Sequence, residues 1–344
     1  MQSPQALPPP LNPSHWPDLD EGQADELWEY WSVFLASQGY RIMGSPLYNT
    51  LGAGVPNRLC PPSNPFLPEE NESFIIHSKA TDMLSTRSLS AWRPCLEICF
   101  AIDGSQRQVV LKAMTKDSRE LYILRRLSSP PLRSDKRNHV IPILDFIDMH
   151  EAVIVVMPAW GMFWNCPPCG SMQLRYQMAT KLTLGLVFLH EQGIAHGDIH
   201  PGNIVISHDN RLARQAPEDD FRNEKNLEYA FLDFGSAQEP ARESLALPIT
   251  TPPAGFCAPE QVLGQGSQAI DLFAADVYNL GKTLQRELSD ALDMYGREHL
   301  RGQNQQQYEG VLLQMTHAQP SKRGTAAQAL DALRSAAERT PTVT

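Results

Sequence analysis

The chain has 344 residues, 42% of them hydrophobic, and a formal net charge of -10 at pH 7. This length is enough for one large core or two smaller ones. No run of lysine and arginine is long enough to follow a phosphate backbone, so nucleic acid is excluded as a general partner. No apolar run reaches the ~18 residues of a membrane helix, and no secretion signal is visible. We therefore expect no membrane insertion and a cytoplasmic or nuclear protein.

The start of the chain predicts a tail followed by one helix. Residues 1–19 are rich in proline and have little periodicity. Apolar residues then recur at helical spacing over residues 21–38. The aromatic side chains of this stripe, Trp28, Trp31 and Phe34, are predicted to pack into the core.

Residues 80–157 predict a region that is mostly β with one helix. Two strand-like runs flank Asp103-Gly104, a pair that supplies the positive backbone angles of a tight hairpin turn. A short helix is expected after this hairpin, because Ser and Pro residues stop its apolar pattern near residue 128. The expected elements are strands at 95–101 and 108–114, a helix at 117–127, and strands at 140–147 and 152–157.

From residue 171 the pattern becomes helical. One apolar stripe predicts a long helix that ends near Gly193. A polar insert at 208–226 predicts a surface loop. The stripe consists of Leu174, Met178, Leu182, Leu186 and Leu189, and further helices are expected at 269–288, 308–317 and 324–338.

The strongest chemical signal is His196-Gly-Asp-Ile-His-Pro-Gly-Asn203, followed by Asp233-Phe-Gly235. Phosphoryl transfer needs metal ions, an aligned hydroxyl and the exclusion of water. Mg²⁺ prefers oxygen ligands, which Asn203 and Asp233 offer. Asp198 supplies a further carboxylate that can accept or orient the proton of the hydroxyl. Together these residues predict a phosphotransferase.

The two motifs resemble the catalytic loop and the metal-binding loop of the protein kinase family. The resemblance continues, in the expected order, over residues 80–338. The matching segments resemble the third-strand lysine at Lys112, its helix glutamate at Glu120, the hinge from Met157 to Gly161, the end of the activation segment at Ala258-Pro-Glu260, the central buried helix from Asp276, and the last signature at Arg323.

This resemblance implies an α+β fold of the protein-kinase type, with two lobes. The small lobe has an antiparallel sheet and one helix, and the larger lobe is helical. The implied domains are an N-terminal extension with one helix at 1–79, an N-lobe at 80–160, a C-lobe at 161–338 and a tail at 339–344.

The resemblance also implies a function: transfer of the ATP γ-phosphate to Ser or Thr hydroxyls of a protein substrate, with Mg²⁺ as cofactor. ATP is expected between the lobes, with its adenine against the hinge. The implied catalytic residues are Asp198, Lys112, Glu120 and His200, the ATP-binding residues are Lys112, Met157, Ala159 and Trp160, and the metal ligands are Asn203 and Asp233.

A narrower resemblance concerns a group of kinases common in mushroom-forming fungi. It is carried by Trp31 to Ile42, by Leu127-Ser-Ser-Pro-Pro-Leu132, and by Asn138-His-Val-Ile-Pro-Ile-Leu-Asp145. Members of that group are usually described only as protein kinases. The resemblance therefore narrows the family but does not indicate a substrate.

Two departures from the family pattern concern the nucleotide. No glycine-rich loop precedes Lys112, and residues 85–94 stand in its place, where Arg87 or Arg93 is a candidate source of positive charge. Lys112 and Glu120 are only eight residues apart, so their ion pair requires the helix to start almost at once. Both departures favour an alternative, a nucleotide-binding pseudokinase without turnover. A pure interaction protein would leave the catalytic motif unexplained.

Two further departures concern the catalytic loop. Gly197 replaces an arginine that commonly receives an activation-loop phosphate, which predicts activity without phosphorylation of Ser244, Thr250 or Thr251. His200 replaces a lysine, and both phosphate contact and structural hydrogen bonding remain open for it. These departures favour a second alternative, a small-molecule phosphotransferase of the aminoglycoside or choline type.

The remaining notable residues are expected to be structural. Asp276 and Arg323 should anchor the large lobe, with Arg323 paired to Glu260. Cys166-Pro-Pro-Cys169 resembles half of a zinc or redox site, but no second pair stands at a matching spacing, so no metal is expected there. Six cysteines are too sparse to indicate a disulfide framework.

Overall fold

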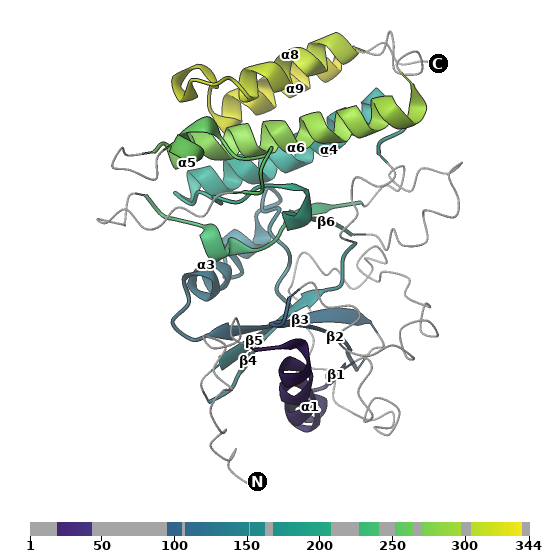
Figure 1. Ribbon diagram of the computed structural model, residues 1–344, viewed down its shortest axis with the longest axis vertical. Helices are drawn as coiled ribbons and strands as arrows, with labels where there is room; N and C mark the ends of the chain where they lie inside the picture. Colours follow the sequence, from purple (N-terminus) through teal and green to yellow (C-terminus); the bar gives the residue numbers. More distant parts are fainter. Residues whose placement is uncertain are drawn as a thin grey trace. The chain divides into compact units, whose positions relative to one another are not determined.

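The computed structural model describes residues 19–42, 95–104, 107–150, 152–161, 168–207, 227–240, 252–263, 270–296 and 304–338. The chain divides into two compact units. The first unit comprises residues 1–134 and 141–160, and the second comprises residues 135–140 and 161–344. The first contains an antiparallel sheet and the second is mainly helical (Figure 1). The predicted α+β, kinase-like fold is confirmed.

Several predicted features lie outside the described residues. They are most of the proline-rich tail, the boundary at 79/80, the stretch 85–94 with Arg87 and Arg93, Cys166, the polar insert at 208–226, Ser244, Thr250, Thr251, and the tail at 339–344.

The sheet of the first unit has the strand order β1-β2-β3-β5-β4, and every neighbouring pair is antiparallel. The predicted hairpin is formed by β2 and β3, and Asp103 closes it by accepting the Arg107 amide at 2.9 Å. All of β5 is buried, in keeping with its apolar sequence. The strands are β1 (Arg41–Ile42), β2 (Ile98–Ile102), β3 (Gln108–Thr115), β4 (Asp145–Asp148) and β5 (Ala152–Pro158).

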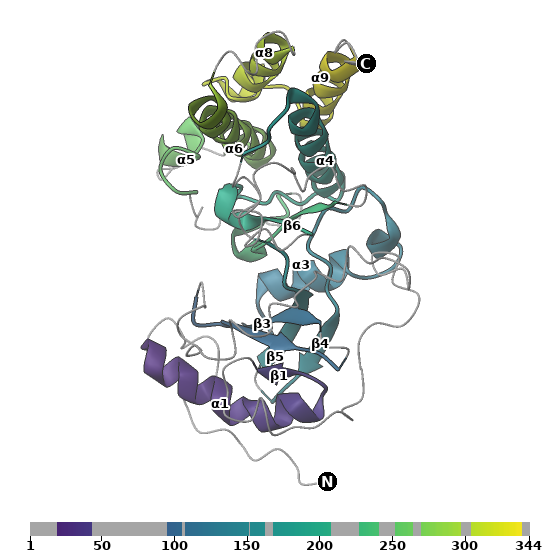
Figure 2. The ribbon, with the colours of Figure 1, turned by 90° about the vertical axis from the view of Figure 1, so that its right-hand side faces the viewer.

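Two helices flank this sheet. Helix α1 (Glu21–Ser37) lies along one side, and α3 (Arg119–Leu127) lies on the other (Figure 2). Trp28 and Trp31 are buried against the strands, and the Trp28 ring nitrogen donates to the carbonyl of Leu96 at 3.0 Å. The core prediction is correct for both tryptophans.

The same prediction is wrong for Phe34. Its side chain is 37% exposed, next to the exposed Val33. A helix turns by about 100° per residue, so Phe34 lies at the margin of the stripe that Trp28 and Trp31 bury.

The strand predicted at 140–147 begins only at Asp145. Residues 141–144 are not in a strand, and Val140 forms an isolated bridge with Phe231, both within the second unit. Pro142 explains the difference, because proline has no amide donor for a ladder and restricts the residue before it.

The second unit is built on two long helices. Helix α4 (Met172–Glu191) packs along α9 (Ala326–Glu338), and α6 (Leu272–Tyr295) packs along α8 (Gln305–Met315), as Figure 2 shows. Every residue of the predicted α4 stripe is buried. The unit also contains the short helix α5 (Pro259–Leu263) and a two-stranded sheet of β6 (Ile204–Ile206) and β7 (Tyr229–Phe231).

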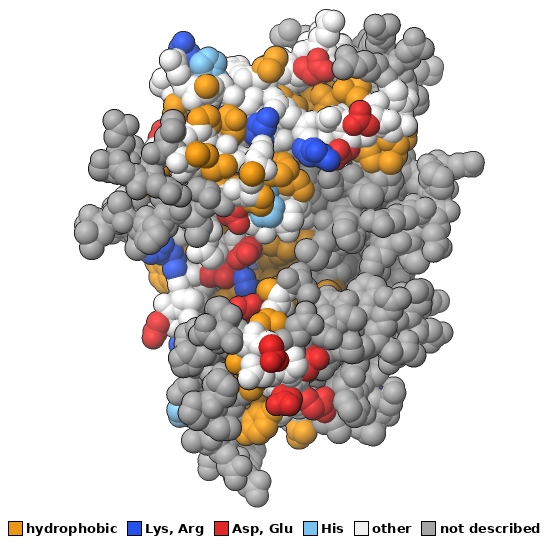
Figure 3. Space-filling model, viewed as in Figure 1, with side chains coloured by type: hydrophobic (Ala, Val, Ile, Leu, Met, Phe, Trp, Pro, Cys, Tyr) orange, Lys and Arg blue, Asp and Glu red, His pale blue; other side chains and the backbone are white. Residues whose placement is uncertain are grey.

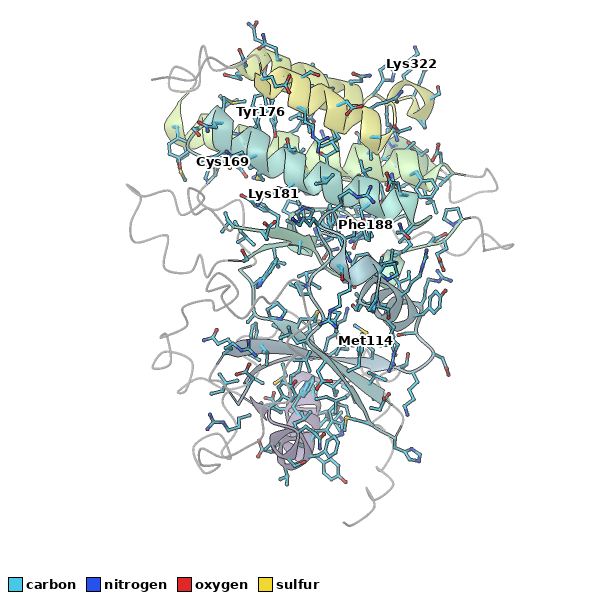
Figure 4. The ribbon with its side chains drawn as sticks, turned by 180° about the vertical axis from the view of Figure 1, so that it is seen from behind. Met114, Cys169, Tyr176, Lys181, Phe188 and Lys322 are labelled. Carbon is cyan, nitrogen blue, oxygen red and sulfur yellow. The ribbon has the colours of Figure 1, made fainter. Side chains whose placement is uncertain are left out.

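Figure 4 shows α4 with Tyr176, Lys181 and Phe188 labelled along its length. The Tyr176 ring packs edge-on against Tyr308 of α8, with centroids 5.1 Å apart, and Phe188 is fully buried. Helix α4 therefore presents large side chains to the elements that surround it.

A fully buried ion pair joins α4 to α6. Arg175 Nε lies 2.7 Å from Glu287 Oε2, and neither side chain is exposed. The Cys169 amide donates to Glu287 Oε1, and its carbonyl accepts from Arg175, each at 2.7 Å. Cys169 is thereby fixed as a buried residue. Within the described parts of the chain, no cluster of three or more His, Cys, Asp or Glu side chains suited to a metal occurs.

The surface of the second unit carries scattered apolar side chains. Figure 3 shows hydrophobic atoms exposed among polar ones over its helices. Val262, Met294 and Leu313 are each more than half exposed. They belong to α5, α6 and α8, which is typical of isolated surface hydrophobics rather than of one continuous patch.

Candidate active site

In the first unit, Lys112 and Glu120 form an ion pair. Lys112 Nζ on β3 lies 2.7 Å from Glu120 Oε1 in the first turn of α3. Helix α3 begins at Arg119, directly after Ser118, whose hydroxyl accepts the Leu121 amide. This cap starts the helix at once, and the short link between Lys112 and Glu120 is therefore compatible with the pair. Both side chains are mostly buried, at 15% and 13% exposure.

The segment that resembles a hinge follows β5. Met157 is buried within the strand. The Ala159 amide donates to the Gln108 carbonyl at 3.2 Å, so β3 already uses this donor. Trp160 is half-buried, and its ring nitrogen has no hydrogen-bond partner within the described residues. Ala159 is thus held in place, while Trp160 keeps an unused donor.

In the second unit, the residues from His196 to Asn203 form one tight loop after α4. Asn203 Nδ2 donates to both the carbonyl and the Oδ2 atom of Asp198, each at 2.9 Å. Asp198 Oδ1 is buried and has no hydrogen-bond partner among the described residues. His200 Nε2 lies 3.7 Å from Asp198 Oδ2. The structure therefore brings three of the predicted residues together.

Helix α6 holds this loop through Asp276. Its carboxylate accepts the amides of His196 at 2.7 Å and Gly197 at 2.8 Å. The ring of His196 is buried, and its Nε2 atom lies 2.9 Å from the Leu232 carbonyl. The prediction that Asp276 is an anchor is confirmed, because its side chain orients the backbone of the loop.

Gly197 has a positive φ of 79°, and an added Cβ would lie 2.7 Å from the Ser236 carbonyl oxygen. Both observations require glycine, since a side chain would be strained and would also collide with backbone. In the sequence, Gly197 stands out only as the replacement of a common arginine. In the structure, Gly197 allows the backbone at Ser236 to lie close to the loop.

Asp233 follows β7 in a left-handed conformation, with φ 58° and ψ 82°. Its carboxylate accepts the Gly235 amide at 3.4 Å. The Leu232 amide donates to the Asn203 carbonyl at 2.9 Å, which ties the chain before Asp233 to the catalytic loop. A non-glycine residue in this region is strained by about 1–3 kcal/mol, and such strain is concentrated at functional sites.

The predicted pair of Glu260 and Arg323 is present. Arg323 Nη2 donates to Glu260 Oε2 at 2.7 Å, a second bond joins Nη1 to Oε1, and Arg323 is fully buried. Arg323 Nη1 also donates to the Ala274 carbonyl of α6 at 3.0 Å. This confirms the structural prediction for Arg323.

Two side-chain amides in this region, Gln261 and Asn279, were not predicted from the sequence. Gln261 Oε1 accepts the Ala258 amide at 2.9 Å and Asn279 Nδ2 at 3.0 Å, and Gln261 Nε2 donates to the Gly197 carbonyl at 3.4 Å. They connect α5, α6 and the catalytic loop. Nothing in their spacing identified them, because each bond depends on tertiary packing.

The donor set suits Mg²⁺. The Asn203 nitrogen is used by Asp198, which leaves the amide oxygen of Asn203 for a ligand. Asp233 offers a carboxylate just after the end of β7. Oxygen atoms from a carboxylate and an amide are ligands that Mg²⁺ accepts, together with phosphate and water.

Comparison with known proteins identifies the family to which this chain belongs. Residues 104–334 match the family described as "Protein kinase domain", which is well over half of the chain. No match was found among curated proteins. No helix in the described parts of the chain is long and apolar enough to span a membrane. The resemblance to a fungal kinase group stays a prediction. The extent of the family match shows that the chain belongs to the protein kinase family.

Proposed function

We propose that this chain transfers the γ-phosphoryl group of ATP to serine or threonine hydroxyls of protein substrates, with Asp198 as the catalytic carboxylate. The supporting observation is the buried Asp198 Oδ1, which has no partner within the described residues. An unsatisfied buried acceptor costs about 1–3 kcal/mol, so it calls for a ligand that satisfies it. The hydroxyl of an acceptor substrate does so by donating its proton.

The proposed reaction is an in-line displacement. The acceptor oxygen forms a bond to the γ-phosphorus, the bond from phosphorus to the bridging oxygen breaks, and ADP leaves. Asp198 orients the acceptor hydroxyl and accepts its proton. Asn203 helps by holding Oδ2 at 2.9 Å, which leaves Oδ1 for the substrate.

The other predicted residues have supporting roles in this proposal. Lys112, fixed by Glu120 at 2.7 Å, is assigned to the α- and β-phosphates. Met157, Ala159 and Trp160 are assigned to the adenine. Asn203 and Asp233 would hold Mg²⁺, which when bound neutralises the charge that develops on the phosphates.

Two observations bear against the small-molecule alternative. Gly197 favoured that class because it replaces an arginine, but the backbone near Ser236 requires glycine at this position for steric reasons. The ion pair of Arg323 and Glu260 is a feature that small-molecule phosphotransferases usually lack. A protein acceptor is therefore the better-supported proposal.

The pseudokinase alternative retains one argument. The Lys112–Glu120 pair is formed, so the short link between these residues no longer favours a non-catalytic protein. The sequence still has no glycine in the stretch 85–94, which precedes β3. A protein that binds ATP without transferring phosphate therefore remains the second candidate.

The test compares the native chain with Asp233→Asn, using labelled ATP and Mg²⁺ against separate pools of proteins and metabolites. We expect labelled phosphoserine or phosphothreonine in the protein pool, strongly reduced in the variant. Asp331→Asn is the matched control, because it makes the same change at an exposed site on α9.

Each contrary result has a distinct meaning. Equal activity of the native chain and Asp233→Asn would refute the metal-ligand assignment. Label confined to metabolites would favour the small-molecule alternative, and phosphotyrosine would correct the acceptor class. A thermal shift with ATP and Mg²⁺ but no transfer would identify a pseudokinase.

A further inference from the structure

His200 is fixed by its own backbone. It is the residue before the short 3₁₀ turn Pro201–Asn203, and its Nδ1 atom accepts the Gly202 amide at 3.1 Å. A Cβ on Gly202 would lie 2.8 Å from His200 Cε1, so the imidazole lies close against this glycine. The ring orientation is thus set by Gly202 and does not depend on a ligand.

This contact also sets where the ring carries its proton. Nδ1 accepts an N–H bond and therefore carries no proton. A neutral imidazole has one N–H, so the proton must lie on Nε2. The Nε2–H group is the one that lies near Asp198, at 3.7 Å from Oδ2.

The distance of 3.7 Å is too long for a hydrogen bond, and a movement of less than about 1 Å would form one. Hydrogen bonds in active sites are often long without substrate and tighten in the reacting complex. Oδ2 already accepts from Asn203, and Oδ1 has no partner in the described chain. A second donor to Oδ2 would fix the plane of the carboxylate and leave Oδ1 as its unengaged oxygen.

We propose that His200 is a positioning residue, which donates Nε2–H to Asp198 Oδ2 when the acceptor hydroxyl is bound. This inference rests on the proposed function of Asp198. His200 orients the carboxylate as a neutral donor, so it places no net positive charge beside it. The role differs from direct contact with a phosphate, for which a cation would be the stronger partner.

Two substitutions test the roles of the two His200 nitrogens separately. His200→Asn keeps an acceptor for the Gly202 amide but is too short to reach Asp198. His200→Gln places an amide donor near the position of Nε2. We expect kcat to fall at least tenfold in His200→Asn and to recover most of its native value in His200→Gln, with KM for ATP unchanged. A bond to a charged partner is worth about this much.

The matched control is His317→Asn. His317 Nδ1 accepts the Gln319 amide at 3.0 Å, which is the same local arrangement outside the catalytic loop. We expect this substitution to leave phosphate transfer unchanged. Thermal midpoints of all three variants, compared with the native chain, separate loss of positioning from loss of folding.

A second measurement does not depend on activity. Nitrogen NMR of the His200 ring should show the Nε2–H tautomer, and the Nε2 resonance should shift in Asp198→Asn. The Nδ1–H tautomer would overturn the inference even if the protein transferred no phosphate, because Nε2 would then carry no proton to donate.

Kinetics distinguish the two proposals. Native-like kcat in His200→Asn would remove the positioning role and leave the phosphotransferase proposal intact. Loss of activity in both His200→Asn and His200→Gln, with the native tautomer preserved, would also contradict it. Absence of transfer by the native chain would refute the proposed function itself, and the NMR result would still decide whether Nε2 carries the proton that the positioning role requires.

Discussion

Two groups of acidic side chains in the second unit use their oxygens differently. Asp276 and Glu287 are fully buried, and both carboxylate oxygens of each accept hydrogen bonds from protein groups. Asp198 engages only Oδ2, while Oδ1 is buried without a partner in the described chain. The acids that hold the fold are satisfied by the protein, and the acid proposed for chemistry is not. The use of both oxygens therefore distinguishes these two anchors from the acid that we propose as the catalytic carboxylate.

The largest effect in this comparison is expected for Asp198→Asn. The amide can still accept from Asn203 through its oxygen, so the loop should keep its structure. Loss of the base should reduce phosphate transfer by roughly 10²- to 10⁴-fold. Transfer rates at saturating ATP and chemical denaturation would measure the two effects. A variant that unfolds more easily but transfers phosphate normally would place Asp198 among the anchors.

For Arg175→Met, we expect the main loss in stability and not in phosphate transfer. It leaves Glu287 charged and unpaired in the core, which should cost about 3–5 kcal/mol of the free energy of unfolding. Adding Glu287→Leu should restore much of this loss, because no isolated charge then remains buried. Urea denaturation of the single and double variants measures the difference. Equal stability of the single variant and the native chain would contradict the anchor role.

A smaller effect is expected for Gly197→Ala, compared with Gly193→Ala. Both glycines have positive φ, 79° and 72°, so alanine should cost each about 1–2 kcal/mol in backbone strain. A Cβ at Gly193 meets nothing within 4 Å, whereas at Gly197 it meets the Ser236 oxygen at 2.7 Å. Gly197→Ala should therefore be less stable than Gly193→Ala and should also transfer phosphate more slowly. Indistinguishable variants would show that the loop accommodates the side chain.

The smallest effect concerns pH. His139 is buried and its Nδ1 atom lies 2.9 Å from the Tyr229 carbonyl, and burial lowers the pKa of its imidazole below the ordinary value. The unfolded chain binds the proton near pH 6.5 and the folded chain does not, so stability should fall as pH drops through about 6.5. His139→Gln should flatten this slope in urea denaturation between pH 7.5 and 5.5. An unchanged slope would assign the pH dependence to other groups.

The sequence was most informative where pattern and order agreed. The helix stripe of α4, the hairpin at Asp103 and the ion pairs of Lys112 and Arg323 followed from periodicity and motif order. Each of these features is defined by residues with a distinctive chemistry or by a repeated spacing. Predictions of such features are reliable because tertiary contacts seldom override them.

The sequence was least informative where the role of a residue depends on a contact with a residue far away in the sequence. The role of Gly197 depends on the Ser236 carbonyl, and that of Gln261 depends on Asn279 and on the catalytic loop. The strand predicted at 140–147 starts later, at Asp145, and the cause is local, because Pro142 lies in an otherwise apolar run. A motif also does not reveal that Asp198 Oδ1 has no partner among the described residues, because the use of each oxygen depends on the folded structure.

The strand β1 has a practical consequence for shortened forms of this protein. The family match starts at residue 104, yet β1 pairs with β2, and the two buried tryptophans of α1 cover the same sheet. A recombinant fragment trimmed to the matched region would lose both strands and the helix. It would expose β3 as a bare edge beside uncovered apolar surface, an arrangement that favours aggregation. Expression boundaries for biochemical work should therefore begin before Asp20, well upstream of the recognisable family signature.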